Sequence, residues 1–116
     1  MSLTSSILVL RCLNLDTSRR FYEALGLAFT EEQHGKGPVH FACEIGAMVF
    51  ELYPPNDAGA TQNLMLGFTV DDLGAVLGSL AGLGYQPKSP PKNNRVTVLD
   101  PDGNAVMLSS VAEKPL

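Results

Sequence analysis

The chain has 116 residues, 45% of them hydrophobic, and a formal net charge of −4. This length suffices for one compact domain over residues 1–116, and the sequence has no basic patch of the kind that binds nucleic acid. The apolar run Ile7–Leu10 ends at Arg11 and is too short for a membrane span or a secretory signal. Cys12 and Cys43 fall in strand patterns without CxxC spacing, which is typical of buried reduced thiols; a disulfide between them is the alternative. We therefore expect a soluble, cytoplasmic domain with no nucleic-acid or membrane partner.

The first half of the chain, about residues 6–53, predicts a βαβββ module. A strand over 6–13 ends before Asn14 and Asp16, either of which can cap the helix that follows. That helix is expected over 16–26, with Gly26 as its stop signal. Three strands are then expected at 28–34, 39–45 and 47–53.

A polar segment over 54–63, with proline and glycine, is typical of a linker. After it the pattern restarts, giving a second module over about 64–110. Its expected elements are a strand at 64–70, a cap at Asp71 or Asp72, a helix ended by Gly84, a proline-broken strand or loop at 85–94, and two strands around the turn Asp100–Asn104.

The two halves form an internal repeat. Leu25-Gly26 recurs as Leu83-Gly84 at an offset of 83 − 25 = 58, and a slightly shorter offset, 107 − 51 = 56, aligns Glu51 with Met107. Each half can cover only one sheet face with its single helix, so we expect the halves to share a core.

Three motifs together resemble the vicinal oxygen chelate superfamily, which includes glyoxalases, bleomycin-resistance and fosfomycin-resistance proteins, and extradiol dioxygenases. They are the Phe21-Tyr22 pair in the first helix, Leu25-Gly26-Leu27 after it, and the turn Asp100-Pro101-Asp102-Gly103-Asn104, within a resemblance that covers about residues 7–108. The resemblance implies an α+β fold in which two βαβββ modules form a curled mixed sheet, shaped as a cup with helices on its outer face. It also implies a two-fold homodimer, and metal ligands on the first and fourth strands of each module.

The family's four metal-ligand positions fall on Ile7, Glu51, Met65 and Met107. Only Glu51 offers an oxygen ligand, since thioether sulfur binds hard cations weakly and isoleucine offers no ligand atom. We therefore expect no bound catalytic metal, no other cofactor, and none of the Lewis-acid chemistry that a metal would supply.

Strand alternation predicts which side chains line the cup and which lie under the helices. The expected ligand-binding residues are Ile7, Val9, Arg11, His40, Glu51, Tyr53, Met65, Thr69 and Met107. The residues expected in the core are Leu8, Leu10, Cys12, Met48, Phe50, Leu52, Leu64, Leu66, Phe68, Val106 and Leu108.

The polar candidates each have two interpretations. Glu51 is either a ligand-binding or catalytic carboxylate, or a residue without such a role that pairs with Arg11 or lies at a solvated rim. Arg11 is either an anion clamp or the ion-pair partner of Glu51. His40 is a hydrogen-bonded structural residue or a base or metal ligand, and His34 is expected in a loop. The 85–94 segment is a lid or a solvated loop.

The first functional hypothesis is a metal-independent family member that binds a small organic molecule in an apolar cup. The net negative charge of the chain is compatible with a cationic ligand. The alternative is a lyase, an isomerase, or a glyoxalase-like or dioxygenase-like enzyme. It would use Glu51 as a base or residual metal ligand, with His40 the leading further ligand. A third hypothesis is a degenerate domain that serves in dimerisation or regulation. The sequence leaves the choice between enzyme and carrier open.

Overall fold

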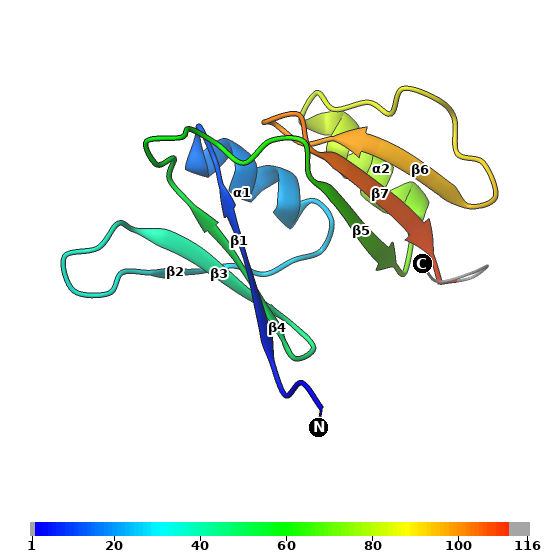
Figure 1. The fold of residues 1–116 in the computed structure, drawn as a ribbon. Helices are drawn as coiled ribbons and strands as arrows, with labels where there is room; N and C mark the ends of the chain where they lie inside the picture. The colour runs from blue at the N-terminus through cyan, green and yellow to red at the C-terminus, as the bar shows by residue number, and fades with distance from the viewer. Residues whose placement is uncertain (1, 112–116) are drawn as a thin grey trace.

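A computed structural model describes residues 2–111. The described elements are β1 (Ser6–Arg11), α1 (Leu15–Glu23), β2 (Thr30–Glu32), β3 (His40–Ile45), β4 (Met48–Tyr53), β5 (Met65–Val70), α2 (Leu73–Gly82), β6 (Arg95–Leu99) and β7 (Ala105–Ser110). They form a four-stranded sheet in the order β1-β4-β3-β2 and a three-stranded sheet in the order β5-β7-β6 (Figure 1). Both sheets are mixed and neither closes into a barrel, which confirms the α+β class.

The repeat is visible in the strand register. In the first sheet β1 runs parallel to β4 with Ile7 opposite Val49, and in the second β5 runs parallel to β7 with Met65 opposite Ala105. The helix caps repeat as well. The side chain of Asn14 accepts a hydrogen bond from the backbone N–H of the residue three positions later, and the side chain of Asp72 does the same, each at 3.0 Å. Of the alternative caps, Asn14 and Asp72 are therefore the ones used.

The second half departs from the predicted module in one element. Among the described residues, 85–94 contain no strand and form only an isolated bridge between Lys92 and Arg95. Pro87, Pro90 and Pro91 lack the N–H groups that a strand ladder needs, so the proline-broken segment is a loop. The second module is accordingly βαββ.

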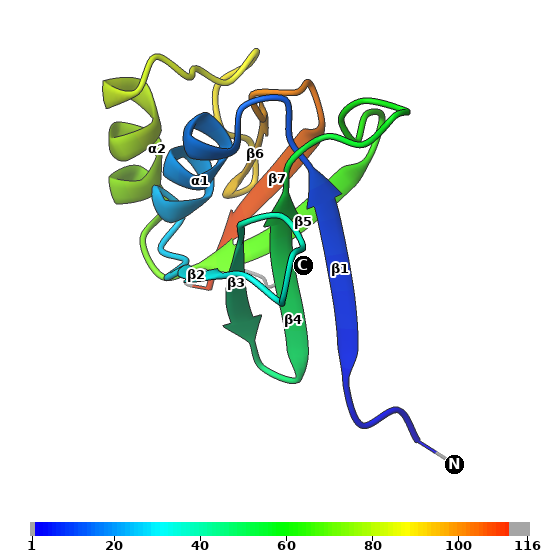
Figure 2. The same ribbon diagram turned by 90° about the vertical axis from the view of Figure 1, so that its left-hand side faces the viewer.

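One core is shared by both halves, between the helices and the sheets. Figure 2 shows both helices on the same side of the two sheets. The side chain of Tyr22 on α1 is fully buried. The centroid of its ring is 5.2 Å from that of Phe50 in the first sheet and 6.4 Å from that of Phe68 in the second. All eleven residues expected in the core belong to it or pack against it. The alternation that defined the two faces of these strands is thereby confirmed.

The turn Asp100–Asn104 joins the second module to the first. The buried Asp100 carboxylate accepts bonds from the Tyr22 hydroxyl at 2.6 Å and from the backbone N–H groups of Asp102 and Asn104, each at 2.9 Å. The Asn104 side chain donates to the Thr61 carbonyl at 2.9 Å and accepts from Leu64 N–H at 3.0 Å. The turn therefore fixes α1 and the end of the linker against β7.

The two cysteines are buried free thiols, as the first interpretation of their positions expected. Burial raises the pKa of the Cys12 thiol to about 11, and the charges of Asp102 and Asp100 act in the same direction. None of the helices in the described part of the chain is long and apolar enough to cross a membrane.

Candidate functional site

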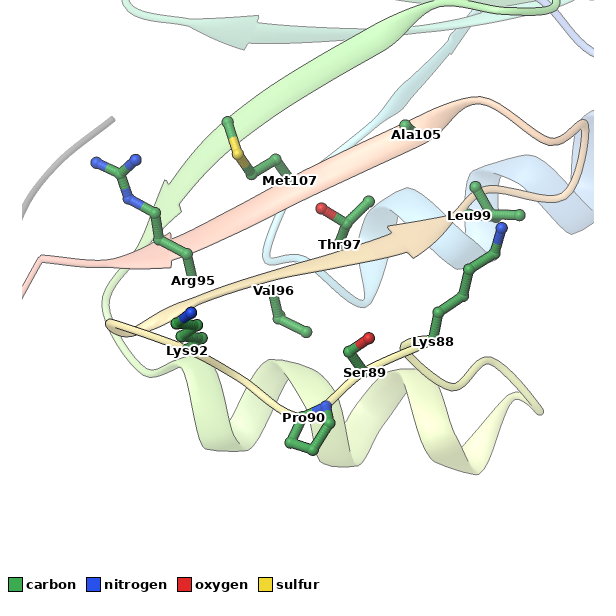
Figure 3. Close-up of a pocket in the computed structure, with 10 residues that line it drawn as sticks. All are labelled: Lys88, Ser89, Pro90, Lys92, Arg95, Val96, Thr97, Leu99, Ala105 and Met107. Atoms are coloured by element: carbon green, nitrogen blue, oxygen red, sulfur yellow. The ribbon is translucent and has the colours of Figure 1, made fainter.

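Three of the nine residues expected to line one cup line two hollows of the chain, Ile7 and Glu51 in one and Met107 in the other. The other six line neither of them: Val9, Arg11, His40, Tyr53, Met65 and Thr69. One hollow, of about 710 Å³, is lined from the first module by Ile7, Ala28, Thr30, Glu32, Ala42, Cys43, Glu44, Val49 and Glu51. We call it the first-module hollow. The other, of about 430 Å³, is lined by Lys88, Ser89, Pro90, Lys92, Arg95, Val96, Thr97, Leu99, Ala105 and Met107 (Figure 3). We call it the second-module hollow.

The four family metal positions do not fit a divalent cation. Ile7 and Met65 stand on open strand faces and are 63% and 67% exposed, whereas Glu51 is only 8% exposed. Met107 lines the second-module hollow, and Glu51 and Ile7 line the first. One carboxylate, two thioethers and an alkyl group that do not share one hollow do not make a set of ligands for a hard or borderline cation.

Glu51 lies on β4 opposite Val9 of β1, on the face turned away from the core. Its Oε2 atom is 3.7 Å from Nε2 of His40. The hypothesis that Arg11 pairs with Glu51 is wrong: the ion pairs within residues 2–111 include none between them. The Arg11 guanidinium instead lies over the Tyr53 ring, 5.0 Å from its centroid, and its Nη1 donates to the Pro54 carbonyl at 3.4 Å.

His40 is 1% exposed and held in one orientation. Its ring stacks on Tyr53 with centroids 4.1 Å apart and an interplanar angle of 9°. Nδ1 is 3.1 Å from the Pro38 carbonyl oxygen, which can only accept, so Nδ1 is the donor of this hydrogen bond. The Tyr53 hydroxyl lies 3.4 Å from Nε2. The stacked side chains of His40 and Tyr53 thus place polar groups beside Glu51.

The remaining expected ligand residues are placed as follows. Thr69 on β5 shares a hydrogen bond with Ser109 of β7 at 3.3 Å. Figure 3 shows Met107, Thr97 and Arg95 on the face of the second sheet turned away from α2. The 85–94 loop forms one wall of the second-module hollow through Lys88, Ser89, Pro90 and Lys92.

Several residues of these surfaces were not predicted from the sequence. Glu32 and Glu44 add two carboxylates to Glu51 in the first-module hollow, and Lys88, Lys92 and Arg95 make the second-module hollow cationic. Glu32 pairs directly with His40 across β2 and β3. Alternation along the expected strand 28–34 places Glu32 and His34 on one face, and this signal could have found the cluster.

The chain was compared with known protein families, with curated proteins and with solved structures. Residues 6–108 match the sequence profile of the Glyoxalase/Bleomycin resistance protein/Dioxygenase superfamily. No curated protein matches the chain.

Solved structures with a similar fold cover nearly the whole chain. An antibiotic-binding protein from Streptomyces sp. CB03234 has a TM-score of 0.70 at 20% identity, over 95% of this chain and 98% of that one. The oxidase ChaP-H2 has a TM-score of 0.73 at 17% identity, over 95% and 94%. A glyoxalase/bleomycin resistance protein from Albidiferax ferrireducens has a TM-score of 0.66 at 21% identity, over 94% and 98%. The profile match covers most of the sequence, and the chain therefore belongs to the Glyoxalase/Bleomycin resistance protein/Dioxygenase superfamily.

Proposed function

We propose that this protein binds a small organic molecule carrying a positive charge, with the first-module hollow as its ligand site. The observation that carries the proposal is the nearly buried Glu51 carboxylate in a hollow that also holds Ile7 and Val49. A hollow that combines carboxylates with apolar side chains suits a partly apolar cation, because the apolar groups supply burial and the Glu51 carboxylate orients the charge. Glu32 and Glu44 strengthen the negative potential of the same hollow.

The composition of the family metal positions supports a binding role. Ile7, Met65 and Met107 stand where the family places metal ligands, so these positions do not offer the ligands of a Lewis-acidic metal ion. A structural neighbour that is an antibiotic-binding protein is compatible with this role.

A second copy of the chain would enclose the ligand, and we include a homodimer in the proposal. The first-module hollow carries Glu32, Glu44 and Glu51, and the second-module hollow carries Lys88, Lys92 and Arg95. Placing the acidic hollow of one protomer against the basic hollow of its partner would match opposite charges and cover apolar strand residues that are open in one chain. The mass in solution, measured by light scattering after gel filtration, should be that of two chains.

The proposal is tested by calorimetric titration with benzyltrimethylammonium, a compact aromatic cation, and with neopentylbenzene, a neutral molecule of the same shape. Glu51→Gln should weaken binding of the cation about tenfold and leave the neutral molecule nearly unaffected, since a lost charge contact of about 1.4 kcal/mol corresponds to that factor. Glu44→Gln is the matched control, with the same change of charge in the same hollow. Failure of the cation to bind, or equal effects of both variants, would contradict the proposed role of Glu51.

A second candidate function is general-base catalysis by Glu51, which its contact with His40 favours. The same Glu51→Gln variant separates the two functions. A base-catalysed turnover would fall by about 10² or more in this variant, whereas a carrier converts no ligand in either form.

A further inference from the structure

We propose that Glu32, His34 and His40 form a binding site for a divalent cation of the zinc type, at a position different from the four family metal positions. The carboxylate and the two imidazoles each offer one ligand atom, and these atoms all lie within 4.8 Å of one another. The expectation of no metal was drawn from Ile7, Glu51, Met65 and Met107, so it does not bear on this cluster.

The hairpin formed by β2 and β3 brings the three residues together. Glu32 ends β2 and lies opposite His40, the first residue of β3, while His34 follows on the connecting turn. Nε2 of His40 is 3.4 Å from Oε1 of Glu32, and Nε2 of His34 is 3.5 Å from the same oxygen. Two ligands bound tetrahedrally to zinc at its usual bond lengths of about 2.0–2.1 Å are separated by about 3.4 Å. Both separations from the Glu32 oxygen agree with that value, and the ligand atoms of the two histidines lie within 4.8 Å of each other.

The orientation of His40 is that of a prepared metal ligand. Its Nδ1–H donates to the Pro38 carbonyl, so Nε2 is the ring nitrogen that faces Glu32, 3.4 Å from Oε1. Ligating histidines usually donate their other ring N–H to a carbonyl or carboxylate, and this bond fixes the tautomer and the ring position. The stacked Tyr53 ring restrains His40 further. His34 is 74% exposed at its side chain, so it can adjust to complete the site.

The ligand types and the local charge select the class of cation. Imidazole nitrogens with a carboxylate suit zinc and neighbouring transition metals, whereas calcium and magnesium require mostly oxygen ligands. Glu51 is a second carboxylate beside the site, since its Oε2 is 3.7 Å from Nε2 of His40. The described residues that line the first-module hollow include three glutamates and no lysine or arginine, so the local field attracts a cation. Three protein ligands leave a fourth position for water or another ligand.

The test is titration of the untagged full-length protein with ZnCl₂, followed by calorimetry and by NMR of the imidazole nitrogens. The chain has two histidines, and both belong to the proposed site. We expect one zinc ion per chain, with both imidazole signals shifted at one equivalent. Replacement by Co²⁺ should give the visible spectrum of nitrogen and oxygen ligation without the thiolate charge-transfer band.

His34→Gln and Glu32→Gln should each weaken zinc binding at least about tenfold. His34 is exposed, so its replacement leaves the core intact. Glu31→Gln is the matched control, because this residue has the same charge on the same strand and alternates to the opposite face. No binding near one equivalent, imidazole signals that do not move, or equal losses in the Glu31 and Glu32 variants would overturn the proposal. His34→Gln leaves every residue that lines the first-module hollow unchanged, so the metal site and the organic-ligand site can fail independently in this variant.

Discussion

Replacing Tyr22 by Phe should destabilise the fold by about 2 kcal/mol, because it removes one hydrogen bond to a buried carboxylate and little else. The Tyr22 hydroxyl donates to Asp100 at 2.6 Å. The rest of the ring stays in its edge contacts with Phe21 and Phe50. Asp100 keeps three donors, from the backbone of Asp102 and Asn104 and from the Asn104 side chain. A hydrogen bond to a charged group contributes about 1.5–3 kcal/mol, and the remaining donors favour the lower part of that range.

Urea denaturation followed by circular dichroism measures this loss. With a urea dependence of about 1.5 kcal/mol/M, the midpoint should fall by about 1.3 M while the slope stays constant. Tyr85→Phe is the matched control, because the Tyr85 ring also packs edge-on against Phe21, at 5.0 Å, and exposed or unbonded hydroxyls contribute within about 0.5 kcal/mol. Equal midpoints for the Tyr22 and Tyr85 variants would refute the role given to the Asp100 carboxylate in joining the two modules.

Two further predictions concern the repeated caps and the buried thiol. Asn14→Ala and Asp72→Ala should each lower the free energy of unfolding by about 1 kcal/mol, because each side chain accepts one backbone N–H bond of 3.0 Å at the start of its helix. Urea midpoints that do not move would contradict the capping role. The stability of the protein should fall as the pH rises from about 9 to about 11, because the pKa of the Cys12 thiol is raised from 9.0 to about 11 in the folded state and the unfolded chain loses this proton first. Below pH 9 the thiol is protonated in both states and its full contribution is present. Cys12→Ala should flatten the stability profile in this window, and an unchanged slope between pH 9 and 11 would show that other groups cause the loss.

The sequence was informative wherever a local rule decides the outcome. The stop glycines, the caps and the two-residue alternation predicted both helices and six of the seven described strands closely, with β2 shorter than expected. The 85–94 segment was ambiguous because β composition and prolines compete there, and the missing N–H groups decided in favour of a loop. The prediction that Glu51 pairs with Arg11 was wrong, because the Arg11 guanidinium lies over the ring of its cross-strand neighbour Tyr53.

By itself the sequence determined the repeat, the family motifs and the core-facing side of the strands, because all of these depend on residue type and spacing. The assignment of the family's metal-ligand positions to Ile7, Met65 and Met107 rests on the resemblance and stays a prediction. Only the tertiary structure decided that Ile7 and Glu51 line an acidic hollow and Met107 a separate basic one. It also decided that Glu32 and His34 converge on His40. Both outcomes depend on how separate segments pack: a shared core sets the two sheets relative to each other, and hairpin register sets which polar side chains meet.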